Sequence, residues 1–543
     1  MKSIGARQCC QLSGKHRKDT GGTPVDSLRA DHTTSFFHDS CVGGPRRPTT
    51  TYAYDKGNRL TQINDSVSGL ITRTYDGLNR LTSEATPQGS VAYTYDVASR
   101  RATMTVPGQS SVVYSYDNAN RLTQITQGTS IVGFGYDNAN RRTFLTLPNG
   151  VLVEYGYDAA SRVTGITYKQ NGTTVLGDLA YEYDKADNRN KVGGSFARTG
   201  IPESVASANY SAANQQTTFG DKTLTYDENG NLQSITDSNG TTLYTWNARN
   251  QLVGISGPTV NASFVYDATG RRQKKTINGS LTEFLYDGVN PVQESSGATI
   301  LANILPGLGI DEFLTRTDVV AGTTSNFLTD ALGSPVAVTD NAGAVQTEYT
   351  YEPFGKTSFT GASNSSSYQY TGRENDGTGL FYYRARYYHP QLQRFISEDP
   401  IGFSGGDANL YAYVGNNPVN LVDPNGLSGI DGSSRGGMPI WPTPGPASPA
   451  DLGAWLWDTF LAWPVVHSWA NEINAEINRA KGFICDKLVY ICFDRVPRLT
   501  SPHWNVRVVF GYNGQPAVKP LIDTNRTSCF PYTLPGSNPK CCN

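Results

Sequence analysis

Cysteine is absent from the long middle of this 543-residue chain, between residues 42 and 484. That absence excludes disulfides and thiolate metal sites from most of the sequence. The eight cysteines lie near the two ends, as Cys9, Cys10, Cys41, Cys485, Cys492, Cys529, Cys541 and Cys542. The five in the C-terminal part leave at least one thiol unpaired within that part, and the spacing does not determine which of the others pair.

Long apolar runs and an excess of either charge are also missing. No uninterrupted apolar stretch reaches the length of about 18 residues that a membrane-spanning helix needs. The N-terminal MKSIGARQCCQLSGKHRKDTGG is basic but lacks the apolar core of a secretory signal, so any export is expected to use a non-classical route. A net charge of −2 argues against a general binder of nucleic acid.

Tyrosine and glycine are abundant, with 31 and 56 residues respectively, while only 37% of the residues are hydrophobic. Aromatic residues suit half-buried strands, and glycine suits tight turns. The composition therefore predicts a mainly β fold of many short strands.

A repeat of about 20 residues begins at Tyr52. Its mark is an aromatic-x-Tyr-Asp string, and the first six aspartates follow one another at steps of 21, 20, 21, 20 and 21 residues. Such regularity indicates a repeat architecture. We count about eleven units, one or two of them degenerate, and residues 209–219, in the gap between Asp184 and Asp227, look like a decayed copy. The marked positions are Asp55, Asp76, Asp96, Asp117, Asp137, Asp158, Asp184, Asp227, Asn247, Asp267 and Asp287.

Each repeat predicts a β-hairpin. The two aromatics fall on one face of a strand, the Asp opens a tight turn, and Arg-Leu-Thr-Gln-Ile forms the returning strand. An Arg follows the Asp by four residues in most units, which predicts an Asp–Arg pair across each turn. One hairpin cannot bury its own aromatic face, so the hairpins are expected to join into a long ribbon curled as a spiral. Exposed tyrosines would instead offer a carbohydrate-binding or adhesive surface.

The strings after the repeats carry a specific resemblance. LPGLGIDEFLTRTD at 305–318, FLTDALGSPVAVTDNAGAVQTEYTYEPFG at 327–355 and YTGRENDGTGLFYYRARYYHPQLQRFISEDPIG at 370–402 follow in that order. From Tyr52 to Leu427 the chain resembles the Rhs family of YD-repeat proteins. The resemblance implies a β-spiral shell around a variable C-terminal domain, usually a toxin, which the shell releases by aspartyl-type autoproteolysis. It also implies a cognate immunity protein and a secretion apparatus as partners. No cofactor or metal is expected.

Two similar turns stand where the repetitive text ends, Asp399-Pro400-Ile401-Gly402 and Asp423-Pro424-Asn425-Gly426. Two carboxylates that share one proton can activate water and protonate a leaving nitrogen. By its motif positions, the resemblance implies a site of Arg386, Asp399 and Asp423 that cuts between Leu427 and Ser428. The alternative is that both aspartates only cap turns.

Beyond Leu427 the composition changes to a Gly/Pro/Ser linker followed by a Trp- and Cys-rich module. We expect a helix from about Ser448, a second from about Val465 to Lys481, and strands in LVYICFDRV and NVRVVFGYNG. The apolar segment 452–469 can pack in the module's own core, dock on the shell or lie in a membrane interface. No spacing of its histidines or cysteines indicates a metal site or a nuclease, so no toxin active site is named.

The predicted fold is therefore a mainly β YD-repeat spiral with a small α+β C-terminal module. The predicted function is a carrier that resides in the cytoplasm before export and then acts outside the cell or at its surface. There it releases an effector for bacterial competition or host interaction, as a single-turnover aspartyl autoprotease. The alternative is a structural or adhesive cell-surface protein with an inert tail. The predicted divisions are an unpatterned segment 1–48, repeats 49–300, a core with the cleavage motif 301–427, a linker 428–449 and the effector-like module 450–543.

Overall fold

The computed structural model describes residues 48–431, 489–496, 503–512, 515–516 and 527–532. Two large antiparallel sheets make up most of it, and in each of them every strand pairs with the next one along the chain. The first sheet contains β1 (Thr50–Tyr54), β2 (Leu60–Asp65), β3 (Gly69–Tyr75), β4 (Leu81–Thr86), β5 (Gly89–Tyr95), β6 (Arg101–Thr105), β7 (Val112–Tyr116), β8 (Leu122–Gln127), β9 (Ser130–Tyr136), β10 (Arg142–Thr146), β11 (Leu152–Tyr157), β12 (Val163–Gln170), β13 (Thr174–Tyr183) and β14 (Arg189–Gly193).

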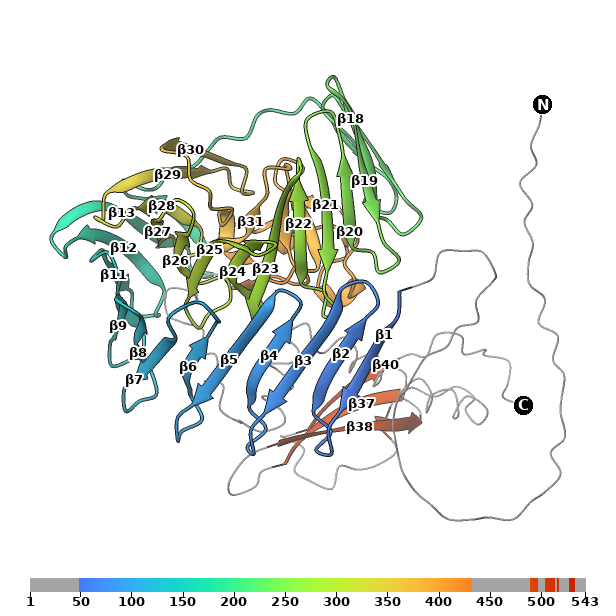
Figure 1. The fold of residues 1–543 in the computed structure, drawn as a ribbon. Coiled ribbons are helices and arrows are strands. Elements are labelled where there is room, and N and C mark those ends of the chain that lie inside the picture. The colour runs from blue at the N-terminus through green and yellow to red at the C-terminus, as the bar shows by residue number, and fades with distance from the viewer. Residues whose placement is uncertain (1–47, 432–488, 497–502, 513–514, 517–526, 533–543) are drawn as a thin grey trace, which may run out of the picture. The chain divides into compact units, whose positions relative to one another are not determined.

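The second sheet has 16 strands in chain order. They are β15 (Ala208–Tyr210), β16 (Gln216–Phe219), β17 (Lys222–Tyr226), β18 (Leu232–Asp237), β19 (Gly240–Trp246), β20 (Leu252–Ser256), β21 (Asn261–Tyr266), β22 (Arg272–Ile277), β23 (Ser280–Asp287), β24 (Asn290–Ser296), β25 (Thr299–Pro306), β26 (Phe313–Asp318), β27 (Thr323–Thr329), β28 (Pro335–Thr339), β29 (Val345–Tyr351) and β30 (Thr357–Gly361). This order of neighbouring hairpins, visible in Figure 1, confirms the predicted mainly β repeat fold. The predicted division at residue 300 stays a prediction, and the sheet runs through it without a break.

The turn of each repeat is held by its aspartate, as the third repeat shows. Asp96 Oδ1 accepts hydrogen bonds from the backbone N–H of Ala98 and of Arg100, both at 2.9 Å. Ser99 takes the left-handed conformation that closes the turn, with φ of 64°. Asn takes this position in several other repeats, because its short polar side chain tolerates left-handed backbone. The decayed copy at 209–219 also forms a hairpin, with β15 paired to β16.

The arginine of each repeat joins one hairpin to the next. Arg100 Nε donates to Asp96 Oδ2 at 2.6 Å, which confirms the predicted pair across the turn. The same guanidinium also donates to the backbone oxygen of Asp117 at 3.3 Å and stacks over the Tyr116 ring at 4.6 Å, both in the following repeat. Equivalent stacking joins Arg59 to Tyr75, Arg80 to Tyr95, Arg121 to Tyr136, Arg141 to Tyr157 and Arg162 to Tyr183.

A β-bulge in the returning strand brings its two apolar residues to one side. Leu122 and Ile125 are three residues apart, so a regular strand would place them on opposite faces. Tyr116 pairs with Leu122 while Ser115 pairs with Gln124, which leaves Thr123 as the extra residue. Both Leu122 and Ile125 are buried as a result.

The two sheets share one hydrophobic core and several buried ion pairs. Valines and tyrosines of the first sheet pack with Leu285, Val292 and Leu305 of the second. Arg101 pairs with Asp287 at 2.5 Å, and Arg271 pairs with Glu84 at 2.8 Å. These contacts link residues that lie nearly 190 positions apart in the sequence.

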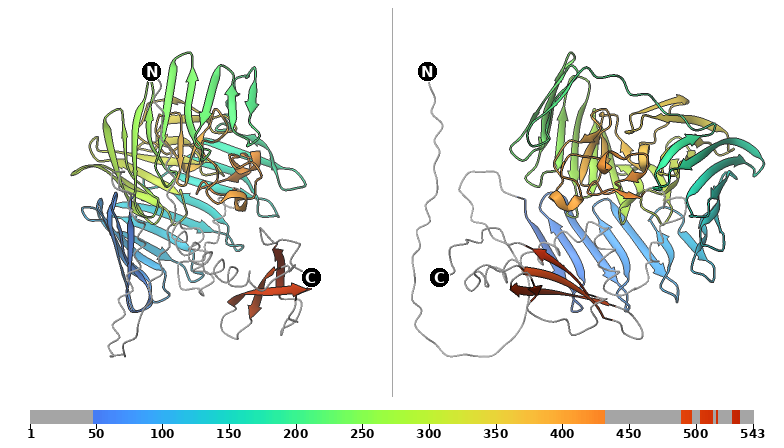
Figure 2. Two further views of the ribbon diagram at one scale, coloured as in Figure 1. Left: turned by 90° about the vertical axis from the view of Figure 1, so that its right-hand side faces the viewer. Right: turned by 180° about the vertical axis from the view of Figure 1, so that it is seen from behind.

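Residues 370–431, which we name the core segment, pack against strands of the second sheet (Figure 2). The segment contains η1 (Tyr370–Gly372), β31 (Glu374–Asn375), β32 (Phe381–Tyr383), β33 (Arg386–His389), β34 (Arg394–Phe395), η2 (Gly402–Gly405), η3 (Val414–Asn416), β35 (Leu421–Val422) and β36 (Ile430–Asp431). Its tyrosines Tyr382, Tyr383, Tyr387 and Tyr388 are almost fully buried. Arg272 of β22 is fully buried as well and pairs with Glu374 and Asp376 of the segment, which anchors the segment to the sheet.

Near the C-terminus the described residues form β37 (Val489–Val496), β38 (His503–Tyr512), β39 (Gln515–Pro516) and β40 (Thr527–Tyr532), in the order β39-β38-β37-β40. β37 and β38 confirm the two strands predicted there. The predicted helices, the linker and segment 452–469 lie outside the described residues. Within the described part of the chain, no helix has the length and apolarity to cross a membrane.

Candidate self-cleavage site

Three short elements of the core segment position the predicted site residues. Arg386 is the first residue of β33, Asp399 follows β34 and Asp423 follows β35. In both Asp-Pro turns the N–H three residues on donates to the Asp carbonyl, from Gly402 to Asp399 at 2.9 Å and from Gly426 to Asp423 at 3.4 Å. Asp399 Oδ1 accepts from the Ile401 N–H at 2.9 Å, and Asp423 Oδ1 accepts from the Leu427 N–H at 3.0 Å. Each carboxylate is thus fixed by its own turn, as the Asp-Pro pattern predicts.

Arg386 lies between the two carboxylates. Its Nη2 is 2.9 Å from Asp399 Oδ2 and 3.6 Å from Asp423 Oδ2. The side chains of Arg386, Asp399 and Asp423 are only 3%, 6% and 2% exposed, so solvent screens these charges little. The Arg386 guanidinium carbon also stacks 3.7 Å from the centre of the Phe395 ring. The remaining guanidinium nitrogens donate to the backbone oxygens of Gly426 and Leu410.

The Leu427–Ser428 bond lies against both aspartates. Asp423 Oδ1 accepts from the Leu427 N–H and also from the Ser428 N–H, at 3.2 Å, and that nitrogen is the leaving group of the predicted cleavage. Asp399 lines the same cavity as Leu427. A methyl placed on Gly405 would be 2.7 Å from Asp399 Oδ2 and 2.8 Å from the Leu427 carbonyl oxygen. Asp399 Oδ2 and the Leu427 carbonyl oxygen are therefore separated by no more than the sum of these two distances. Because Gly405 has no side chain, the space between the two oxygens stays open.

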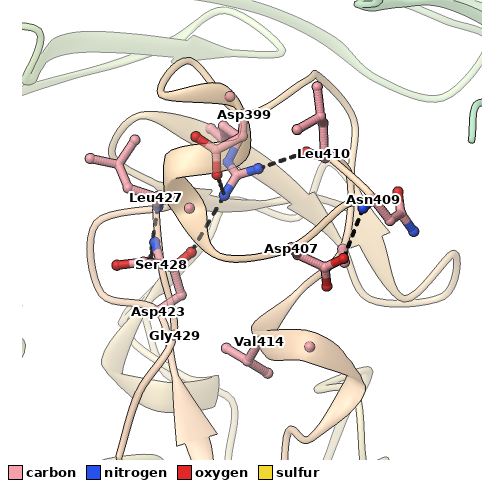
Figure 3. Close-up of a pocket in the computed structure, with 14 residues that line it drawn as sticks. Asp399, Asp407, Asn409, Leu410, Val414, Asp423, Leu427, Ser428 and Gly429 are labelled. Atoms are coloured by element: carbon pink, nitrogen blue, oxygen red, sulfur yellow. Dashed lines mark hydrogen bonds and ion pairs between the residues drawn. The ribbon is translucent and has the colours of Figure 1, made fainter. Parts of the chain in front are cut away.

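A small cavity opens at this bond (Figure 3). It offers about 30 Å³ to a water molecule, and a polar site needs about 10–15 Å³ to hold one. Asp399, Asp423, Leu427 and Ser428 line it together with backbone of the η2 turn. The site therefore has room for the water that hydrolysis consumes.

Burial dominates the acidity of the site. It raises the pKa of Asp423 to about 6, although the charge of Arg386 and the N–H of Leu427 oppose the shift. It also raises the pKa of Asp399, against the charge of Arg386 and the N–H of Ile401. Burial lowers the pKa of Arg386, and the two carboxylates counteract this. Asp423 therefore holds a proton in mildly acidic solution. Arg386 lies closer to the neighbouring Asp399 carboxylate than to Asp423.

All five residues predicted from the sequence meet at this place, although their catalytic roles stay predictions.

Sequence reasoning missed Gly405, the Leu410 carbonyl and Arg384, which contacts the turn of Asp423. The GlyGly pair at 405–406 and the Arg-Ala-Arg string at 384–386 are the signals that could have indicated them. Two titratable residues of the same stretch have other partners: His389 Nδ1 accepts from the Leu392 N–H, and Glu398 accepts from the Tyr411 hydroxyl. Among the described residues no group of acidic, His or Cys side chains could hold a metal ion.

Comparison with known proteins agrees with the architecture. The "Teneurin YD-shell" family model matches residues 149–419, and the "RHS Repeat" model matches residues 75–111. The tRNA3(Ser)-specific nuclease WapA of Bacillus spizizenii is 33% identical over 269 residues, which are 47% of this chain and 11% of that protein. Double-stranded DNA deaminase toxin A of Burkholderia cenocepacia is 30% identical over 264 residues, 41% of this chain and 18% of that protein.

A solved structure shows the same fold at low identity. The crystal structure of TcdB2-TccC3-Cdc42 superposes with a TM-score of 0.53 at 18% identity, over 72% of this chain and 27% of that one. The chain spans between a tenth and a fifth of the length of the two curated relatives named above. The tandem Tyr-Asp hairpins, the core segment that follows them and the two family matches lead to one assignment: the chain belongs to the Rhs family of YD-repeat proteins.

Proposed function

We propose that this chain is a carrier that cuts itself once, between Leu427 and Ser428, and so releases its C-terminal part. The observation that carries this proposal is the position of Asp423. Its Oδ1 lies 3.2 Å from the Ser428 nitrogen, and its carboxyl group has a pKa raised to about 6. A general acid needs both this distance to the leaving atom and a pKa near the working pH.

The reaction is the addition of water across the peptide bond. Asp399, as carboxylate, takes a proton from a water molecule in the cavity, and the water oxygen bonds to the Leu427 carbonyl carbon. Once the carbon is tetrahedral, the Ser428 nitrogen has a free lone pair; Asp423 gives its proton to that lone pair, and the carbon–nitrogen bond breaks. The products are a carboxyl group on Leu427 and an amine on Ser428, and the proton gained by Asp399 returns to Asp423 through solvent.

Arg386 makes the two carboxylates unequal. Its guanidinium is 0.7 Å nearer to Asp399 than to Asp423, with distances of 2.9 Å and 3.6 Å. A nearby positive charge favours the ionised form of a carboxyl group. Asp399 is therefore the better base and Asp423 the better acid. Arg386 also donates to the backbone oxygen of Gly426, the residue just before Leu427 and the proposed scissile bond.

The released part is proposed to be a toxin. Relatives of this chain are named as a tRNA nuclease and a DNA deaminase toxin. Because those activities differ, likeness in the repeats does not determine what residues 428–543 act on. By the same family analogy we propose a cognate immunity protein, a secretion apparatus and export by a non-classical route.

The adhesive alternative depends on exposed tyrosines, and the described repeats offer few. Tyr93 and Tyr114 are about 95% buried, and the rings of Tyr95 and Tyr116 lie under arginines of the preceding repeat. The geometry therefore favours the carrier over the adhesive surface.

Mass spectrometry of the purified, denatured full-length chain tests the proposal. We expect two species, residues 1–427 and 428–543, and a single intact species for Asp399→Asn or Asp423→Asn. A wild-type chain that stays whole after complete denaturation would rule out self-cleavage.

A further inference from the structure

Arg384 makes a second set of contacts with the turn that carries Asp423. One of its guanidinium nitrogens donates to the backbone oxygen of Pro424, the residue next to Asp423. The neighbouring Ala385 N–H donates to the Asn425 oxygen at 3.1 Å. Arg386 holds the Gly426 oxygen on the same turn. Three successive residues of the chain therefore hold three successive carbonyls between Asp423 and the proposed scissile bond.

Arg384 is itself fixed by the second sheet. Its side chain is 6% exposed, and Nη2 lies 2.6 Å from Asp311 Oδ1. Asp311 lies in the connection between β25 and β26, and its side chain is fully buried. Arg384 also donates to the Val289 oxygen, which precedes β24, at 3.2 Å. A buried carboxylate and a carbonyl of the sheet thus determine where the guanidinium lies.

The backbone of both partners is in an unfavourable conformation. Arg384 has φ of 57° and Asp311 has φ of 58°, in the left-handed region that most residues avoid. Such conformations persist only where surrounding contacts hold them. For Asp311 these contacts include the pair with Arg384, a second buried pair with Arg373 at 2.6 Å and a hydrogen bond from the Asp311 N–H to Asn290 Oδ1 at 2.9 Å. The sheet partners of Arg384 and Asp311 lie in or beside β24, β25 and β26, so the position of the pair depends on these strands.

From these contacts we infer that Arg384 is a positioning residue for the self-cleavage, and that its pair with Asp311 makes cleavage depend on assembly of the second sheet. This inference rests on the proposed function. Asp423 Oδ1 must stay within hydrogen-bond distance of the Ser428 nitrogen, and a displacement of about 1 Å can slow a reaction about a hundredfold. Without Arg384 the Pro424 carbonyl loses its buried donor, and the turn can move away from the bond.

The test is a time course of fragment formation after cell-free synthesis of the full chain. The variant is Arg384→Lys, which keeps the charge beside Asp311 but cannot donate to Asp311, Val289 and Pro424 together. The matched control is Arg316→Lys, because Arg316 is an equally buried arginine of β26 whose hydrogen-bond partners are Glu294, at 2.6 Å, and Ser365. Resistance to limited proteolysis reports whether the shell of each variant has folded.

We expect Arg384→Lys to fold and to cleave at least about tenfold more slowly than wild type, while Arg316→Lys cleaves at nearly the wild-type rate. Arg384→Ala should be slower still, and guanidinium ions should partly restore its rate, an effect that a merely structural role would not produce. A folded Arg384→Lys chain that cleaves as fast as wild type would overturn the inference. If wild type itself does not cleave, the proposed function fails instead.

Discussion

Asp423 Oδ1 accepts hydrogen bonds from two successive backbone N–H groups, those of Leu427 at 3.0 Å and Ser428 at 3.2 Å. A turn-capping aspartate needs only the first of these bonds. The second places a buried carboxyl group against the nitrogen of the proposed scissile bond. Under the proposed function, this relationship between Asp423 and Ser428 is what would distinguish a cleavage site from an ordinary Asp-Pro turn.

Removal of the acid should stop cleavage without disturbing the turn. Asp423→Asn keeps an oxygen that can accept from the Leu427 and Ser428 N–H groups, but it has no proton to transfer. We expect no fragments on a denaturing gel. Glu398→Gln is the matched control, because Glu398 adjoins the site in sequence but contacts Tyr411. It should cleave like wild type, and equal loss in both variants would argue against a specific role for Asp423.

The rate of cleavage should fall as the pH rises above about 6. Asp423 must carry a proton to act as the acid, and its pKa is raised to about 6. Each further pH unit above that value removes about nine-tenths of the protonated form. Single-turnover rates after refolding at several pH values measure the effect. A rate that increases steadily from pH 6 to 8 would contradict the assignment of Asp423 as acid.

A methyl group at residue 405 should block the reaction. In Gly405→Ala the new carbon would lie 2.7 Å from Asp399 Oδ2 and 2.8 Å from the Leu427 oxygen, closer than such atoms approach. We expect the Asp399 carboxylate to be displaced and cleavage to slow by about a hundredfold. Ser404→Ala, in the same η2 turn with an exposed side chain, is the control and should have no effect. Fragment formation over time distinguishes the two.

The arginines of the repeats should differ in their contribution to stability according to burial. Arg271 is buried, pairs with Asp267 at 2.7 Å and also joins Glu84 of the first sheet. Arg271→Ala leaves the Asp267 carboxylate buried without that partner, which typically costs about 3–5 kcal/mol. Arg121 makes the same pair across its turn but is 28% exposed. Arg121→Ala should shift the denaturant midpoint far less, and equal shifts would contradict this account. Both are measured in the Asp423→Asn background.

The C-terminal part should be harmful by itself. Expression of residues 428–543 in the bacterial cytoplasm, and separately in the periplasm, should reduce growth in one of the two compartments. The control is the full-length Asp423→Asn chain, from which the part is not released. Normal growth in both compartments would argue against the toxin, while leaving self-cleavage to its own test.

Much of the fold could be predicted because its determinants are local. The step of 20 or 21 residues, the Asp that opens each turn and the Arg four residues later all act within one hairpin, and the structure has the hairpins where the pattern puts them. The bulge at Thr123 was not predictable from a two-residue period, because it depends on how Tyr116 pairs across the turn. The reach of Arg100 to Tyr116 was also missed, since it joins two repeats.

The sequence by itself determined the hairpin repeats and the family, because short motifs carry both, and through the family resemblance it predicted Arg386, Asp399 and Asp423 as site residues. Only the tertiary structure decided that two aspartates 24 residues apart meet at one arginine and one peptide bond. It also decided their acidity, since burial, not sequence spacing, raises the pKa of Asp423. The link from Arg384 to Asp311 spans 73 residues, and such a contact forms only when the core segment packs against the sheet.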